Sequence, residues 1–171
     1  EIINILKKEE KFSDKTIEEI REVELNDFSD IIKEVGKQET EYLNRNEILD
    51  GLNTKTNGKE LYLFKEVMST NTVAKFLSEN DVNNGTVIIS EKQSGAKGRL
   101  GKSWESPLGG IWLSLVVKPN VDHSKIPMIT LATGVAVVKT LERIGIENAE
   151  IKWPNDVMIN DKKVCGILTE A

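Results

Sequence analysis

Short apolar runs alternate with helical stretches from residue 61 onward, and this alternation limits the folds that the chain can adopt. The runs are rich in Leu, Ile, Val and Trp and cover residues 61–67, 86–91, 111–117 and 149–153. Such runs are typical of β-strands. A helix that begins after Ser69 or Thr70 is predicted between the first two runs, and a longer one over 126–144 between the last two. The pattern indicates an α/β or α+β domain.

Two further segments complete the predicted order of elements. Residues 1–44 show helical periodicity and predict a small, mostly helical N-terminal segment, followed by a connector over 45–60 that holds a short helix at 47–52. At the other end, 157–159 and 164–168 read as a hairpin joined by a turn at 160–163. We therefore expect a main domain over 61–171.

Composition indicates an ordinary soluble chain of 171 residues, with 39% hydrophobic and 30% charged residues. No apolar run is long enough for a membrane span and no targeting segment is recognised, so we expect a cytoplasmic protein that does not bind membranes. A single cysteine, Cys165, excludes an internal disulfide, and nothing predicts a metal site in the protein. The net charge of −5 is concentrated in residues 1–50, which argues against binding to DNA phosphates.

The segment 93–104, QSGAKGRLGKSW, combines regularly spaced glycines with three cations, Lys97, Arg99 and Lys102. Glycine lets the backbone turn tightly and approach a ligand, and the cations suit phosphate. The spacing matches neither a P-loop nor a dinucleotide fingerprint. From the residues alone, an anion-binding loop and a flexible, solvated hairpin loop are equally good interpretations.

Two other motifs are weak when they are considered separately. In 151–163, Lys152 ends a predicted strand, Pro154 stops the pairing, and Asn155 and Asp156 form a polar turn; a plain junction between strand and turn is the commoner arrangement. In 68–71, small polar side chains gather at a helix start, where N-capping is the ordinary explanation.

The order of these motifs resembles that of biotin protein ligases. STN at 69–71, Gln93, AKGRLGKSW at 96–104, KWPND at 152–156 and GILTE at 166–170 follow one another as in that family, and the loop is similar to its GRGRxGRxW pattern. The resemblance covers about residue 61 to the end. It implies an α+β fold in which flanking helices cover a mixed β-sheet.

The resemblance also implies a reaction with two steps. The biotin carboxylate attacks the α-phosphate of MgATP, which gives biotinyl-5′-adenylate and pyrophosphate. A lysine of a biotin carrier domain, in a biotin-dependent carboxylase, then attacks the mixed anhydride and releases AMP. The implied ligands are thus biotin, ATP and Mg²⁺, and the family often dimerises through its sheet. A mixed anhydride hydrolyses readily, so a loop that closes over it would serve to exclude water.

The resemblance assigns roles to twelve residues by motif. Those implied to bind biotin are Ser69, Thr70, Asn71, Gln93, Lys97, Gly98, Arg99 and Lys152. Those implied to bind nucleotide are Lys97, Arg99, Lys102, Trp104, Asn155 and Asp156. Lys152 and Arg99 are implied to be catalytic, because they would stabilise the charge that develops at the reacting phosphate.

The sequence departs from the family at several points. Ala96-Lys97 stands where the loop usually has Gly-Arg, and Lys102 stands where it has Arg, so two planar guanidinium groups are replaced by point charges. Family catalytic domains continue beyond GIL-x-E, and we therefore expect that this chain is truncated on its C-terminal side and inactive on its own.

Two alternative functions stay open at this point. One is a biotin-responsive transcriptional repressor, since some relatives carry an N-terminal winged helix where residues 1–44 lie; the acidic charge and the lack of a recognisable wing argue against it. The other is a relative of the lipoate ligases, which share the fold. KWPND together with the basic glycine loop favours biotin.

Overall fold

The computed structural model describes residues 36–37, 40–79 and 82–171, so the helices predicted within residues 1–35 lie outside the described residues. By their contacts the described residues form two compact units. Among the described residues, the first unit comprises those from 36 to 96 together with 105–117, and the second comprises 97–104 and 118–171. Each unit has a three-stranded sheet of its own.

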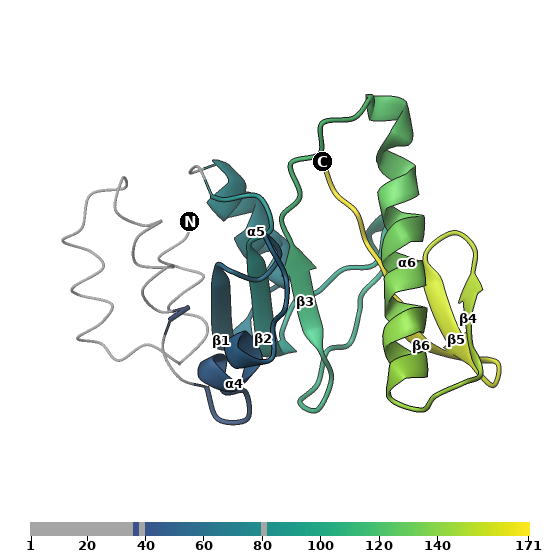
Figure 1. The fold of residues 1–171 in the computed structure, drawn as a ribbon, viewed down its shortest axis with the longest axis horizontal. Coiled ribbons are helices and arrows are strands. Elements are labelled where there is room, and N and C mark those ends of the chain that lie inside the picture. Colours follow the sequence, from purple (N-terminus) through teal and green to yellow (C-terminus); the bar gives the residue numbers. More distant parts are fainter. Residues whose placement is uncertain (1–35, 38–39, 80–81) are drawn as a thin grey trace. The chain divides into compact units, whose positions relative to one another are not determined.

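A mixed sheet forms the centre of the first unit. Its strands are β1 (Leu61–Val67), β2 (Val87–Gln93) and β3 (Trp112–Leu115), in the order β1-β2-β3. β1 pairs with β2 in parallel, and β2 pairs with β3 in antiparallel orientation (Figure 1). The predicted strand at 61–67 has the observed bounds. The predicted mixed sheet with flanking helices is confirmed.

The helix α5 (Thr70–Glu79) covers one face of this sheet, as its apolar spacing predicts. Its Leu77 is fully buried, and Val73 and Ala74 pack against the same core. The sheet contributes the core side chains Tyr62, Phe64, Val67 and Ile88, and Val116 adds to them directly after β3. Because α5 lies between β1 and β2 in the chain, it makes the crossover that a parallel pair of strands requires.

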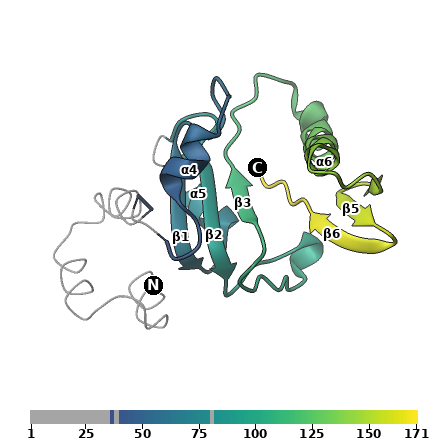
Figure 2. The ribbon, with the colours of Figure 1, turned by 60° about the horizontal axis from the view of Figure 1, so that its bottom comes forward.

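The short helix α4 (Arg45–Asp50) packs on the opposite face of β1 and β2 (Figure 2). It begins two residues before the predicted 47–52. The reason is Asn44, whose side-chain oxygen accepts hydrogen bonds from the backbone N–H groups of Asn46 and Glu47. Leu61 and Leu63 are buried under this helix, so β1 is covered on both faces.

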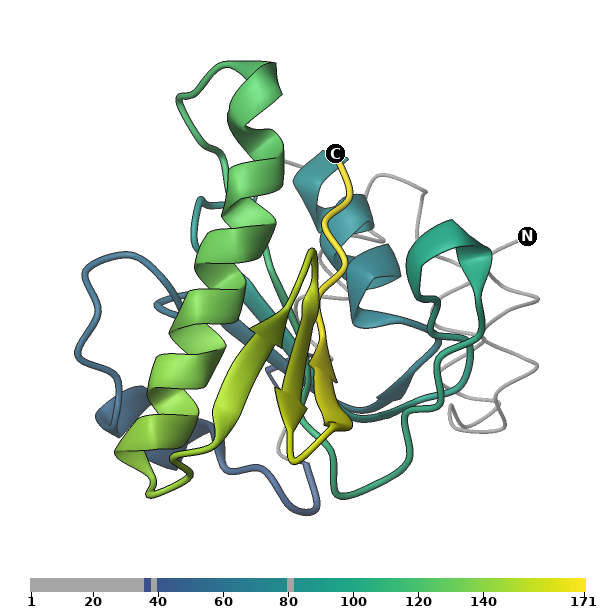
Figure 3. The same cartoon turned by 90° about the vertical axis from the view of Figure 1, so that its right-hand side faces the viewer.

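The second unit consists of one long helix and an antiparallel sheet. Its helical elements are η2 (Arg99–Gly101), η3 (His123–Lys125) and α6 (Ile126–Arg143). The sheet has the order β4 (Ala149–Lys152), β5 (Asp156–Ile159), β6 (Lys162–Gly166), and α6 runs along it (Figure 3). No helix in the described part of the chain is both long and apolar enough to cross a bilayer.

The hairpin of β5 and β6 differs from the prediction in its turn. The predicted turn of four residues is wrong: the turn contains only Asn160 and Asp161, and Lys162 and Lys163 belong to β6. Both turn residues have positive φ, 48° and 60°, which Asn and Asp tolerate and which a two-residue hairpin turn requires. The extra residues extend the sheet and carry two lysines into it.

Candidate functional site

A chain of neutral polar side chains lies beside the mixed sheet in the first unit. Gln93 ends β2, and its Oε1 accepts hydrogen bonds from the backbone N of Thr70 at 2.8 Å and from the Thr70 hydroxyl at 3.2 Å. The first residue of α5 thus has its N–H satisfied by a side chain from a neighbouring strand, which meets the usual need of a helix start. The structure therefore brings together two residues that the family resemblance implied for biotin binding.

Two serines that the sequence analysis did not select extend this chain. Ser114 on β3 is buried, and its hydroxyl lies within hydrogen-bonding distance of Thr70 Oγ1, at 2.8 Å, and of Asn71 Oδ1, so its single hydrogen is shared between them. Ser106 is also buried, and its Oγ accepts a hydrogen bond from Gln93 Nε2 at 2.8 Å. The sequence signal for Ser114 was its place as a polar residue within the apolar run at 111–117. No pattern in the sequence distinguishes Ser106.

The glycine-rich loop of the second unit forms a small closed hairpin. Lys97 and Ser103 form a β-bridge, and Gly98 N donates to Lys102 O at 2.7 Å. Leu100 and Gly101 at the tip have positive φ, 59° and 71°. Glycine adopts this conformation without strain, so the third glycine of the motif is explained by the backbone. The loop is thus a hairpin, and its cations Lys97, Arg99 and Lys102 are all exposed.

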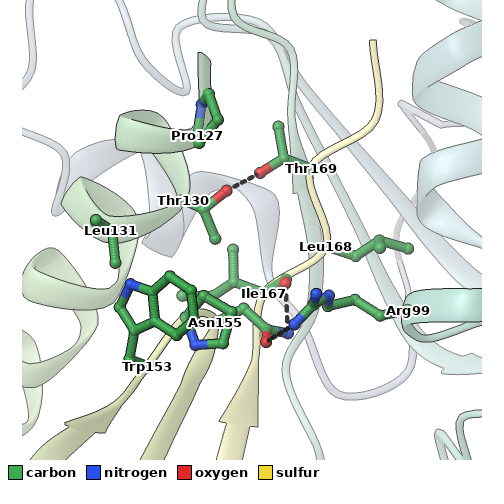
Figure 4. A pocket seen from close by; sticks show the side chains of 10 residues that line it. Arg99, Pro127, Thr130, Leu131, Trp153, Asn155, Ile167, Leu168 and Thr169 are labelled. Atoms are coloured by element: carbon green, nitrogen blue, oxygen red, sulfur yellow. Dashed lines mark hydrogen bonds between the residues drawn. The ribbon is translucent and has the colours of Figure 1, made fainter. Parts of the chain in front are cut away.

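Arg99 connects this loop to the KWPND turn. Its Nη1 donates to Asn155 Oδ1 at 3.1 Å, while Asn155 Nδ2 donates to the carbonyl of Ile167 at 3.1 Å and the Asn155 carbonyl accepts from Ile167 N (Figure 4). Both polar ends of the Asn155 amide are therefore engaged within the protein. Asn155 holds the loop and the segment after β6 in place.

A shallow pocket of about 240 Å³ lies around this contact. Besides Arg99 and Asn155, it is lined by Pro127, Thr130 and Leu131 of α6, by Trp153 and Pro154, and by residues 167–169 (Figure 4). The indole of Trp153 is 77% exposed. The volume is below that of a complete site for a drug-sized ligand, so this pocket can take only part of a larger ligand.

A second cluster lies on one face of the antiparallel sheet. Lys163 Nζ is 2.7 Å from Asp156 Oδ1 and 4.7 Å from the centre of the Trp104 ring. Trp104 in turn lies against Gly166, where a Cβ would come within 2.9 Å of the indole. Asp156 pairs with Lys152 on one side and with Gly166 on the other, so these residues share a row across the sheet.

A β-bulge places Lys163 on this face. Val157 pairs with Cys165 but Met158 pairs with Lys163, so Val164 is the extra residue in β6. In a regular register Lys163 would point to the opposite face, because successive side chains alternate. Lys163 is therefore a candidate functional residue that the sequence analysis missed, and a bulge is not visible in the sequence.

The other residues selected from the sequence have the following positions. Ser69 directly precedes α5, next to Thr70. Lys152 is exposed at the end of β4 and does not line the pocket around Arg99. Lys97, Gly98 and Lys102 belong to the loop hairpin and do not line that pocket either. Asp156 is ion-paired with Lys163 instead of facing the pocket.

The cysteine of β6 is not suited to nucleophilic chemistry. Burial raises the pKa of the Cys165 thiol, and the effect of burial exceeds that of nearby Lys163, which lowers it. A raised pKa keeps the thiol protonated at neutral pH. The described residues also contain no group of three or more His, Cys, Asp or Glu side chains that could hold a metal ion.

The two groups of residues define a class of protein: an α+β domain with a neutral polar site in one unit and a cationic, loop-bearing site in the other. The chain belongs to the biotin/lipoate A/B protein ligase family, whose model matches residues 63–171. The resemblance drawn from the ordered motifs is thereby confirmed.

Curated relatives agree with this assignment. The chain is 40% identical over 141 residues to the bifunctional ligase/repressor BirA of Bacillus spizizenii, which covers 82% of this chain and 42% of the relative. It is 30% identical over 123 residues to the biotin–[acetyl-CoA-carboxylase] ligase of Mycobacterium tuberculosis, covering 66% of this chain and 45% of the relative. The chain spans less than half the length of these relatives.

Solved structures show the same fold. The biotin protein ligase of Aquifex aeolicus, in complex with biotin and ATP, matches with a TM-score of 0.59 and 36% identity, over 66% of this chain and 47% of that one. The biotin protein ligase of Leishmania major, in complex with biotinyl-5-AMP, matches with a TM-score of 0.53 and 26% identity, over 66% of this chain and 52% of that one.

Proposed function

We propose that this chain is the biotin- and ATP-binding part of a biotin protein ligase. In the first step a biotin carboxylate oxygen bonds to the α-phosphorus of ATP, and the bond from that phosphorus to pyrophosphate breaks. In the second step the ε-amine of a carrier-domain lysine attacks the acyl carbon, AMP leaves, and the amine loses a proton. The acceptor is a biotin carrier domain of a carboxylase, and the reaction takes place in the cytoplasm.

The observation that carries this proposal is the hydrogen bond between Arg99 and Asn155. It joins two motifs that are far apart in the sequence, the basic glycine loop and KWPND, in one unit. A guanidinium held at a defined position recognises a carboxylate or phosphate better than a free side chain, because less conformational entropy is lost on binding. A loop that merely solvates its charges would not need this contact.

The polar chain of the first unit suits the head group of biotin. Thr70, Gln93 and Ser114 are uncharged hydrogen-bonding residues, and Thr70 and Ser114 are buried. A ureido group presents both N–H donors and a carbonyl acceptor, so it can pair with such a site. The dithiolane ring of lipoate offers neither, and binding it would leave the remaining Nε2 hydrogen of Gln93 without a partner. This contrast supports biotin over lipoate as the substrate.

The face of the antiparallel sheet that carries Lys163 and Lys152, called here the cationic face, suits the reacting phosphate. Lys163 is held between Asp156 and the Trp104 ring, and Lys152 lies in the same row of the sheet as Asp156. Fixed cations stabilise the negative charge that builds up on phosphorus, and they do so without reorganising during the reaction. The biotin carboxylate is already ionised at neutral pH, so the first step needs no general base.

Magnesium is assigned to the nucleotide in this proposal. The carboxylate of Asp156 lies beside these cations, and it is already paired with Lys163. The described residues therefore do not form a magnesium site of their own, and the ion would be held mainly by the ATP phosphates and water. No step is assigned to a metal held by the protein.

The test is transfer of biotin to an acceptor. The full-length gene product is incubated with biotin, ATP and a purified biotin carrier domain, and the intact mass of the acceptor is measured. We expect the mass of one biotinyl group to be added at one lysine, dependent on ATP. Addition of lipoate but not biotin would show that the chain is a lipoate-ligase relative instead.

A role in transcription has one observation in its favour: the similar Bacillus proteins are named bifunctional ligase/repressor. Residues 1–35, which would have to contact DNA, lie outside the described residues, and their neighbourhood is acidic. A duplex-DNA mobility shift that weakens with salt would favour this role, because phosphate contacts depend on salt.

A further inference from the structure

The side chain of Gln93 is held at both ends of its amide. Its Oε1 faces Thr70, and its Nε2 faces Ser106 at 2.8 Å. The backbones are joined as well, because Gln93 N donates to Ser106 O at 3.0 Å. Ser106 therefore contacts Gln93 through its main chain and its side chain together, although it lies thirteen residues further along the chain.

The orientation of this amide follows from the chemistry of its neighbours. A backbone N–H can only donate, so the Gln93 atom that faces Thr70 N must be the carbonyl oxygen. The nitrogen then faces Ser106, whose hydroxyl accepts its hydrogen bond. Both lone pairs of Oε1 are used by Thr70, through its N–H and its hydroxyl. One Nε2 hydrogen is left for a ligand.

The position of Ser106 makes it a fixed partner. Only 4% of its surface is exposed, so its hydroxyl has little access to water. If this acceptor were removed, Nε2 would lose the hydrogen bond that the structure gives it in a half-buried place, which costs more than losing a contact in water. Oε1 would stay with Thr70, but the amide plane would no longer be held at its nitrogen end, so the remaining Nε2 hydrogen would lose its fixed direction.

We propose that Ser106 is a positioning residue that sets the specificity of the polar site, because it fixes the direction in which the remaining Nε2 hydrogen of Gln93 points. This inference rests on the proposed function, since the ligand acceptor that meets the Gln93 N–H is the ureido carbonyl oxygen of biotin. Ser106 itself does not touch the ligand. It acts by holding the plane of the Gln93 amide.

The experiment compares two ligands in the full-length protein. Calorimetry gives the dissociation constants for biotin and for 2-iminobiotin, in which a protonated nitrogen replaces the ureido oxygen and cannot accept a hydrogen bond. For Ser106→Ala we expect biotin to bind about 3- to 10-fold more weakly, the worth of one hydrogen bond. Binding of 2-iminobiotin should change less, so the preference for biotin falls. Ser106→Thr keeps the hydroxyl and should restore the preference.

A double-mutant cycle separates positioning from structure. If Ser106 acts through Gln93, Ser106→Ala should have no further effect on biotin affinity in a Gln93→Ala background. The matched control is Ser78→Ala, which removes an exposed hydroxyl that bonds only within α5. This control should leave both affinities unchanged.

Three results would overturn the proposal. The first is an equal loss for both ligands in Ser106→Ala, and the second is an effect of the same size in the Gln93→Ala background. Either one would mean that Ser106 merely supports the fold. The third is a wild-type protein that binds no biotin, which would overturn the proposed function and this inference with it. Thermal unfolding checks that each variant folds, and Ser106→Cys replaces Ser106→Ala if the smaller residue destabilises the protein.

Discussion

Arg99 donates a hydrogen bond to Asn155 across 56 positions of the chain, with its Nη1 3.1 Å from the amide oxygen. Asn155 is itself fixed by two hydrogen bonds to Ile167. The loop tip is therefore anchored to the end of a sheet through one side chain of each motif. In the proposed reaction this anchor keeps the guanidinium near the activated carboxylate.

Replacing Arg99 by glycine should release the adenylate early. The variant loses a charge-assisted contact worth about 1.5–3 kcal/mol, so retention of the intermediate should fall about tenfold or more. Released biotinyl-adenylate reacts with any lysine it meets. Mass spectrometry of bystander proteins should accordingly show more biotinylated lysines with Arg99→Gly than with the wild type.

Leu100→Gly is the matched control for this change. Leu100 is 94% exposed and has a φ of 59°, so glycine fits its backbone and adds the same flexibility to the loop. It keeps the guanidinium, and bystander labelling should stay at the wild-type level. Equal labelling by both variants would show that loop stiffness, and not Arg99, retains the intermediate.

Lys163→Ala and Lys152→Ala should both slow the first step, because each removes a cation beside Asp156. Lys163 is ion-paired with Asp156, and Lys152 is its cross-strand neighbour. The loss of one charge-assisted contact is worth about 1.5–3 kcal/mol. We expect the larger effect from Lys163, whose ammonium is already held by Asp156 and Trp104. The rate of pyrophosphate release with biotin and ATP measures both.

Lys162→Ala serves as the control for the two lysines. Lys162 is an exposed neighbour that pairs with Ile159 beside the hairpin turn. Its loss removes the same charge with no effect expected on pyrophosphate release. If all three variants behave alike, only the overall charge of the unit matters, and the assigned positions are wrong.

Alanine substitution should harm the protein at one glycine of the second unit and stabilise it at another. At Gly166 a Cβ would lie 2.9 Å from the Trp104 ring and 3.1 Å from Lys163 Cε, so both side chains must move and pyrophosphate release should fall. At Gly134, inside α6, the nearest contacts would be an ordinary 3.6 Å. Gly134→Ala should raise the free energy of unfolding by roughly 0.5–1 kcal/mol. Full activity of Gly166→Ala would argue against the packing of Trp104 in the site.

Acid should weaken the first unit through Glu60. Burial opposes ionisation of this carboxyl, but hydrogen bonds from Tyr62, Thr86 and Asn83 outweigh it and lower its pKa from the ordinary 4.5. The stabilisation is therefore complete above pH 4.5 and is lost as the pH falls through the lower pKa of the folded state. The melting temperature followed between pH 6 and pH 3 should fall more steeply for the wild type than for Glu60→Gln.

Glu79→Gln at the end of α5 is the comparison for this pH dependence, since Glu79 is exposed. Its melting curve should follow that of the wild type across the same pH range. If Glu60→Gln also follows the wild type, the hydrogen bonds of Glu60 do not contribute to acid sensitivity.

Local patterns predicted most of the fold. The apolar run at 61–67 gave β1 its bounds, and the long helix was predicted to within a residue of the observed Ile126–Arg143 because a glycine follows its last turn. The bounds of short elements were predicted less accurately. β3 is shorter than the predicted 111–117, and β6 begins two residues before the predicted 164–168, since the ends of both strands depend on their partner strands. The residues Thr70 and Gln93, chosen by motif order, do lie in contact.

The missing parts of the site depend on tertiary structure. Lys163 reaches Asp156 only because Val164 is bulged out of the ladder, and no residue type announces that bulge. Nothing in the sequence marks Ser106 as a site residue. It can be recognised as one only in the structure, where the β-bridge brings it to Gln93. Asn155, by contrast, was selected as a ligand-binding residue, and its engaged amide indicates that it holds Arg99.

The most direct test of the proposed function is biotin-dependent exchange of labelled pyrophosphate into ATP by the full-length gene product. Exchange requires that the carboxylate attack the α-phosphorus reversibly, so it reports the first step without an acceptor protein. The proposal predicts exchange that depends on biotin, is absent with lipoate, and falls in Arg99→Gly and Lys163→Ala. Exchange that is independent of biotin, or no exchange with biotin at all, would contradict it.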